Sequence, residues 1–154
     1  MPDLSSIIER EVELTSRFVR LLTEEQDILK AGDIDALPEL SGRKTPLLEQ
    51  LNALEAKRME ILGTSPDSSA REAMERWLAN NNEDRATGTH WKNLLAIARE
   101  AKTLHELNAQ LVGMHLRRTS EILAILRQPS EDSSLYGATG QAVASTGSRL
   151  VDSA

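Results

Sequence analysis

Apolar residues recur every three or four positions along most of the chain, which is the spacing of one face of an α-helix. Two such rows lie side by side in residues 3–31. The first row is Leu4, Ile7, Glu11, Leu14, Phe18, Leu21, Glu25 and Ile28, and the second is Ile8, Val12, Thr15, Val19, Leu22, Gln26 and Leu29. Two adjacent rows predict a helix about 40 Å long whose apolar face meets two partner helices. Gly32 is expected to end this helix in the left-handed conformation.

A second helix is predicted over about residues 34–62. Its heptad row is Leu37, Leu40, Lys44, Leu47, Leu51, Leu54, Arg58 and Ile61. Asp33 or Asp35 is expected to cap its start. Pro46 lies inside the pattern and has no backbone N–H, so a kink or a break is expected near Ser41–Thr45. The short connection at 31–35 predicts that the first two helices are antiparallel neighbours.

Two further helices follow a loop at 63–69. Ser69 and Glu72 have the spacing of a capping box and predict a short helix over about 70–80. The longest helix is predicted over about 89–128, as a rod of about 60 Å, part of which is expected to project beyond the first hairpin. Its heptad row is Trp91, Leu94, Ala98, Ala101, His105, Asn108, Val112, His115, Thr119, Ile122 and Leu126.

The character of the chain changes at Pro129. Residues 129–154 are rich in Ser, Gly, Ala and Thr and show neither a helical nor a strand period, so we expect a largely mobile tail. The predicted fold is all-α. It consists of an elongated antiparallel helical bundle or coiled-coil hairpin over residues 1–128, with three long helices and one short one, followed by the tail at 129–154.

Composition excludes several classes of function. The formal net charge of −6 argues against a nucleic-acid partner. Aromatic residues make up only 3% of the chain, which predicts a long thin core of Leu and Ile rather than a deep ligand pocket. No stretch is long and apolar enough for stable membrane insertion. The absence of cysteine and of a secretory leader fits a cytoplasmic location.

Polar residues within the apolar rows are the candidates for chemistry. His90, His105 and His115 form no metal-binding pair on one helical face, and no catalytic motif is present, so we expect neither a metal, nor a cofactor, nor an enzyme. His105 and His115 are expected to lie in the helical seam as tolerated polar groups. Glu11 and Glu25 of the first helix, with Lys44 and Arg58 of the second, are interpreted as register-setting pairs across the hairpin.

Two other patterns indicate protein binding. Ile122, Leu123, Ile125 and Leu126 crowd about one and a half turns of the long helix. They either form a binding strip or meet the start of the first helix or a second copy of the chain. Leu135 and Tyr136 stand together in the polar tail, where they either anchor a partner or pack back on their own helix.

The organisation of the chain resembles that of the FlgN-type flagellar export chaperones. The resemblance rests on the long first helix, the turn at 32–37 into a Leu-rich helix, the pattern Leu107-Asn108 with Leu111, and the tail run Leu-Tyr-Gly-x-x-Gly-Gln at 135–141. Thr139 departs from the Asp or Asn that is more usual in this run.

The resemblance implies a cytoplasmic chaperone of the flagellar type III export system. Its clients would be the hook-associated proteins of the hook–filament junction, which it would keep unassembled and deliver to the export gate. Client binding is implied for about Met114 to Leu126 and the segment after it, which includes Leu135, and Tyr136 is implied as the contact to the export gate. No nucleotide is implied for holding a client.

Other functions remain open at this point. The same seams would serve a structural helical adaptor or coiled-coil scaffold without a chaperone role, which would form stable dimers or larger species. The chaperone interpretation instead predicts a monomer or a weak homo-oligomer. A nucleic-acid-binding function is disfavoured because the chain has no basic strip, and an enzymatic function is disfavoured because it has no cluster of polar residues.

Overall fold

The structure is a computed structural model, and it describes residues 3–63 and 69–127. Within these residues every regular element is helical: α1 (Leu4–Ala31), a short 3-10 helix η1 (Ile34–Ala36), α2 (Leu37–Leu62), α3 (Ala70–Asn80) and α4 (Arg85–Arg127). The predicted all-α bundle of three long helices and one short helix is confirmed. The predicted tail at 129–154 lies outside the described residues.

The first helix begins and ends with local signals in the sequence. The Asp3 side chain accepts a hydrogen bond from the Ser6 backbone N–H at 2.8 Å, which caps the first turn. Gly32 ends the helix with φ 75°, as predicted, because the left-handed conformation costs glycine no Cβ clash. The two apolar rows are also confirmed, since the buried residues of α1 come from both of them.

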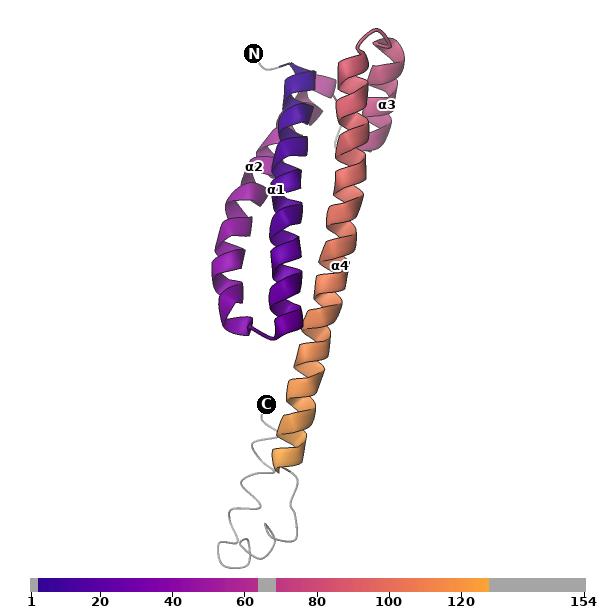
Figure 1. Cartoon of the computed structure of the whole chain (residues 1–154). Coiled ribbons are helices and arrows are strands. Elements are labelled where there is room, and N and C mark those ends of the chain that lie inside the picture. The colour runs from indigo at the N-terminus through magenta and orange to yellow at the C-terminus, as the bar shows by residue number, and fades with distance from the viewer. Residues whose placement is uncertain (1–2, 64–68, 128–154) are drawn as a thin grey trace, which may run out of the picture. The chain divides into compact units, whose positions relative to one another are not determined.

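The second helix differs from the prediction at its start, and of the kink or break predicted near Pro46 the break is excluded. Neither Asp33 nor Asp35 caps it with a side-chain hydrogen bond, because the 3-10 turn η1 makes the connection instead. No break occurs, and α2 continues through Pro46. The carbonyl that loses its partner to Pro46 belongs to Gly42, which is exposed, so water can satisfy it. Figure 1 shows α1 and α2 side by side, and their ion pairs (below) confirm the antiparallel arrangement.

The two remaining helices both have side-chain caps. Ser69 accepts a hydrogen bond from the Glu72 N–H, and α3 has the predicted bounds. The start of α4 lies four residues before the predicted one, because Asp84 caps it through the backbone N–H and the hydroxyl of Thr87, at 3.1 and 2.7 Å. Within the described residues no helix is long and apolar enough to span a membrane.

The chain divides into two compact units, residues 1–111 and a second unit that begins at Val112. In the first unit, one core cluster brings together Leu4 and Ile8 of α1, Met74 of α3, and Trp91 and Leu94 of α4. In the second unit, the described residues are 112–127, which form the last part of α4.

Candidate functional site

A buried ion pair joins α1 to α2. The Nε atom of Arg58 donates to both carboxylate oxygens of Glu11, at 3.0 and 3.1 Å, and the two side chains are only 8% and 3% exposed. The Arg58 guanidinium also lies 5.2 Å from the centroid of the Trp91 ring on α4, a cation–π contact. Burial raises the pKa of the Glu11 carboxyl, and the charge of Arg58 opposes this only in part. The first polar layer, Glu11–Arg58–Trp91, therefore links three helices.

A second polar layer links the same three helices. Lys44 Nζ lies 2.8 Å from one carboxylate oxygen of Glu25. The Asn108 side-chain amide donates to the other oxygen of Glu25 and to the Leu22 carbonyl, both at 2.9 Å. The ammonium of Lys44 lies 5.9 Å from the centroid of the Phe18 ring. Asn108 is 2% exposed; its side-chain N–H group is paired, whereas its Oδ1 atom has no hydrogen-bond partner among the described residues.

The two layers fix the register of the hairpin. Glu25 follows Glu11 by fourteen residues, and Lys44 precedes Arg58 by fourteen residues, so both pairs belong to one antiparallel alignment. The prediction that Glu11, Glu25, Lys44 and Arg58 pair across the hairpin is confirmed. The part played by Asn108 was missed, although an asparagine within an apolar row is the signal for it.

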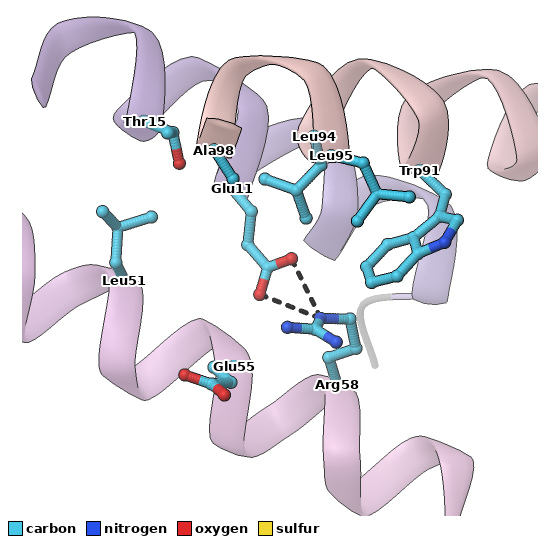
Figure 2. A pocket seen from close by; sticks show the side chains of 9 residues that line it. All are labelled: Glu11, Thr15, Leu51, Glu55, Arg58, Trp91, Leu94, Leu95 and Ala98. Carbon is cyan, nitrogen blue, oxygen red and sulfur yellow. Dashed lines mark hydrogen bonds and ion pairs between the residues drawn. The ribbon is translucent and has the colours of Figure 1, made fainter. Parts of the chain in front are cut away.

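A pocket of about 280 Å³ opens beside the first layer, and Figure 2 shows its walls. Glu11 and Thr15 of α1, Leu51, Glu55 and Arg58 of α2, and Trp91, Leu94, Leu95 and Ala98 of α4 line it. Among the described residues, the buried Nη1 atom of Arg58 has no hydrogen-bond partner. The sequence did not predict this pocket, because the low aromatic content argued against one.

The histidines do not form a site. His105, which was predicted to lie in the helical seam, is exposed, and the half-buried Leu104 is its neighbour in the chain. His115 is half-buried, in the second unit. Across residues 3–63 and 69–127 the structure contains no group of three His, Asp or Glu side chains that is placed to hold a metal ion.

The last part of α4 carries a cluster of exposed apolar side chains. Its seven large members are Val112, Met114, Leu116, Ile122, Leu123, Ile125 and Leu126, which are between 41% and 75% exposed. They include five of the six residues predicted to bind a client. The sixth, Leu135, and the predicted export-gate contact, Tyr136, lie outside the described residues. The C-terminal apolar segment, as we call residues 112–127, is the largest run of exposed apolar side chains in the part of the chain that the structure describes.

Apolar side chains of this segment point in opposite directions. Leu116 and Ile125 are nine residues apart, which is two and a half helical turns, so they lie on opposite sides of α4. Both are strongly exposed, at 66% and 69%. A helix that is apolar on more than one side is typical of one that is surrounded by other protein. The segment also carries three arginines and one glutamate, whereas the chain as a whole has a net charge of −6.

Comparison with known proteins is consistent with this architecture. The chain is 29% identical over 144 residues to the flagella synthesis protein FlgN of Proteus mirabilis, and the match covers 92% of this chain and 91% of that protein. No solved structure matches it. The model of the family described as FlgN protein matches residues 1–144. The chain therefore belongs to the FlgN family.

Proposed function

We propose that this protein is a cytoplasmic chaperone of flagellar type III export. It binds hook-associated proteins, prevents their premature assembly and delivers them to the export gate. The observation that carries the proposal is the C-terminal apolar segment. So many exposed apolar side chains close together are rare on a protein surface unless the surface binds a partner. The family match and the name of the Proteus mirabilis relative supply the flagellar context.

The segment has the chemistry of a helix-binding surface. Burial of a large apolar side chain contributes about 1.5–3 kcal/mol, so a few of these seven side chains are enough to offset the cost of association. Because Leu116 and Ile125 lie on opposite sides of the helix, one flat surface cannot bury both. The client must therefore surround the helix, either with two of its own helices or with a helix and an adjoining segment. An apolar client helix held in this way is unavailable for subunit assembly.

The charge of the segment adds specificity. Arg117, Arg118 and Arg127 outnumber the single acid Glu121. Acidic residues at the edge of the client's apolar strip would complement them, which speeds association and disfavours other partners. Binding should therefore weaken as salt is raised.

Delivery to the export gate is assigned to Tyr136, on the basis of the family resemblance alone. A single aromatic side chain in a polar run suits a weak and readily exchanged contact. The client and the export gate would then bind separate parts of the chain, so that a substitution can abolish binding of one partner and leave binding of the other intact.

The test is co-purification with a hook-associated protein. The C-terminal variant replaces Ile122, Ile125 and Leu126 with Ser. The matched control replaces Ile34 and Ile61, which are 49% and 41% exposed in the first unit, with Ser. We expect the wild type and the control to retain the client and the C-terminal variant to lose it, with unchanged helical content in all three.

Two results would contradict the proposal. Equal retention of the client by the C-terminal variant would remove the segment as the binding site. A stable dimer of the wild type that retains no client, and that the three substitutions dissociate, would favour the structural adaptor instead. A Tyr136→Ala variant that binds the export apparatus as tightly as the wild type would remove the assignment of the gate contact.

A further inference from the structure

Arg118 lies among the apolar side chains of the C-terminal apolar segment. On a helix, the surface neighbours of a side chain are three, four and seven residues away. For Arg118 they include Met114 one turn before it, Ile122 one turn after it and Ile125 two turns after it, which are 56%, 50% and 69% exposed. Large apolar side chains therefore lie on both sides of Arg118 along the helix.

Arg117 has different surroundings, although it is the next residue in the chain. Its neighbours at the same spacings are small or polar apart from Met114, and they include Gly113, Ser120 and Glu121. Both arginines are exposed and belong to the same turn of α4. Arg117 is therefore a matched control for Arg118, because the two differ in their surroundings and not in the type of side chain.

A partner that covers the apolar neighbours of Arg118 also removes water from its guanidinium group. Burial of a charge is costly unless an acceptor pairs with it. Glu121, three residues after Arg118, also lies four residues after Arg117, so one acid serves two arginines, and neither arginine forms an ion pair with a described residue. The acceptor must therefore come from the partner. A carboxylate suits a guanidinium best, because the two groups pair through two parallel hydrogen bonds.

The charge and the shape of the segment indicate which partner covers it. With three arginines and one glutamate the segment has a net charge of +2 (3 − 1) when His115 is neutral, so a second copy would bring like charges together. An anionic lipid surface would match the charge. It contacts only one side of a helix, however, whereas Leu116 and Ile125 lie on opposite sides. A protein helix with a carboxylate satisfies both conditions.

We propose that Arg118 determines which client helices bind, by pairing with an Asp or Glu that has apolar residues one turn before it and one turn after it. This proposal rests on the function proposed for the C-terminal apolar segment and specifies the chemistry of its partner. The apolar neighbours of the acid pack on Met114 and on Ile122 with Ile125. A helix that is apolar throughout this stretch leaves the guanidinium buried without an acceptor, so it binds more weakly.

Arg118→Met tests the proposal, because pairing and exposure to water predict opposite effects. If Arg118 pairs with a client carboxylate, the substitution leaves that carboxylate unpaired, and affinity for a hook-associated protein in titration calorimetry should fall at least about 30-fold. If the guanidinium only extends past the client into water, methionine adds to the apolar surface and affinity stays the same or rises. Arg117→Met should change affinity less than about 5-fold. Arg118→Lys keeps the charge and should recover part of the loss.

A double-mutant cycle identifies the acid on the client. Each Asp and Glu of the hook-associated protein is replaced by Leu, one at a time. One of these client variants should bind the wild-type chaperone at least about 10-fold more weakly than the unchanged client does. The same client variant should bind Arg118→Met no more weakly than the unchanged client does, because the interaction is already absent.

Several results would overturn the proposal. If Arg118→Met binds the client as tightly as the wild type or more tightly, Arg118 does not select the client, whereas loss of the client by the C-terminal variant would still support the proposed function. The absence of any client acid that couples to Arg118 would have the same meaning. Self-association in place of client binding, strengthened by Arg118→Met, would identify the occupant as a second copy. Binding to phosphatidylglycerol vesicles in place of the client, weakened equally by Arg117→Met and Arg118→Met, would identify a lipid surface.

Discussion

Removing the positive charge of the first polar layer should destabilise the fold strongly. Arg58→Met leaves the Glu11 carboxylate, which is 3% exposed, without its counter-charge. Two unit charges about 4 Å apart attract by about 4 kcal/mol at an effective dielectric constant of about 20. This agrees with the loss of about 3–5 kcal/mol that is typical when one partner of a buried pair is removed. A loss of this size is a large fraction of the about 5–15 kcal/mol that stabilises an ordinary domain.

The double variant Glu11→Leu/Arg58→Met separates the cost of burying the two charges from the attraction between them. It removes both charges and fills the space with apolar atoms, so its free energy of unfolding should lie within about 1 kcal/mol of the wild type or above it. Urea unfolding followed by far-ultraviolet circular dichroism measures all three proteins. A loss below about 1 kcal/mol in the single variant, or a double variant as unstable as the single one, would refute the reasoning.

The pH dependence of the single variant gives an independent check. Burial already raises the pKa of Glu11, and without Arg58 nothing lowers it, so in the variant this pKa should rise further. A folded-state pKa above the unfolded value means that stability is present at low pH and is lost as pH rises through the folded pKa. The difference in free energy of unfolding between Arg58→Met and the wild type should therefore become smaller as the pH is lowered from about 7 to about 5. A constant gap would mean that Glu11 remains charged in the variant.

Other predictions test the helix ends and the two classes of apolar residue. Gly32→Ala, at φ 75°, should lose about 1 kcal/mol in urea unfolding, whereas Gly42→Ala, inside α2 with nothing within 4 Å of the new Cβ, should gain about 0.5–1 kcal/mol; effects of the same sign would contradict the backbone argument. The Asp84 carboxylate accepts two hydrogen bonds from the first turn of α4, which lower its pKa, so its stabilising effect should be present above about pH 4 and lost as pH falls through the folded pKa; thermal melts of Asp84→Ala should converge with those of the wild type in acid. Ile125→Ser should change the free energy of unfolding by less than about 0.5 kcal/mol, whereas Leu22→Ala should cost about 2–5 kcal/mol, and similar losses would contradict their assigned exposures.

Helix ends were predictable wherever a local signal marked them. Gly32 and Ser69 act within one turn of themselves, so the end of α1 and the start of α3 follow from the sequence. The start of α4 was predicted four residues late, because its cap Asp84 lies in a polar run that reads as a loop. The continuity of α2 through Pro46 depends on how exposed the Gly42 carbonyl is, which the sequence does not give.

One seam position of α4 was predicted wrongly, although Asn108, which comes later in the same row, is buried as the row predicts. The register that places Trp91 and Leu94 in the core is correct, but the same heptad count places His105 in the seam, where it is exposed. At this level of α4 the half-buried side chain is that of Leu104.

The candidate site was predictable where it depends on pairing within one hairpin. Glu11 and Arg58 were assigned correctly because a short connection and one heptad register determine which residues face each other. The pocket depends instead on how far α2 and α4 stand apart above α1, and no local pattern encodes that separation. The unsatisfied Nη1 atom of Arg58 likewise becomes visible only with atomic geometry.

The spacing of the two polar layers limits how the length of this hairpin can change in evolution. If α2 alone gained or lost one heptad between the layers, one of the two pairs would break, and Arg58 would face Leu4 or Phe18 if Lys44 kept its partner. Even an insertion of a whole heptad, which keeps the apolar rows in phase, would bury a charged side chain against apolar side chains. Relatives with longer or shorter hairpins should therefore carry matched insertions or deletions of whole heptads in both helices, or changes confined to the ends beyond Glu11 and Glu25.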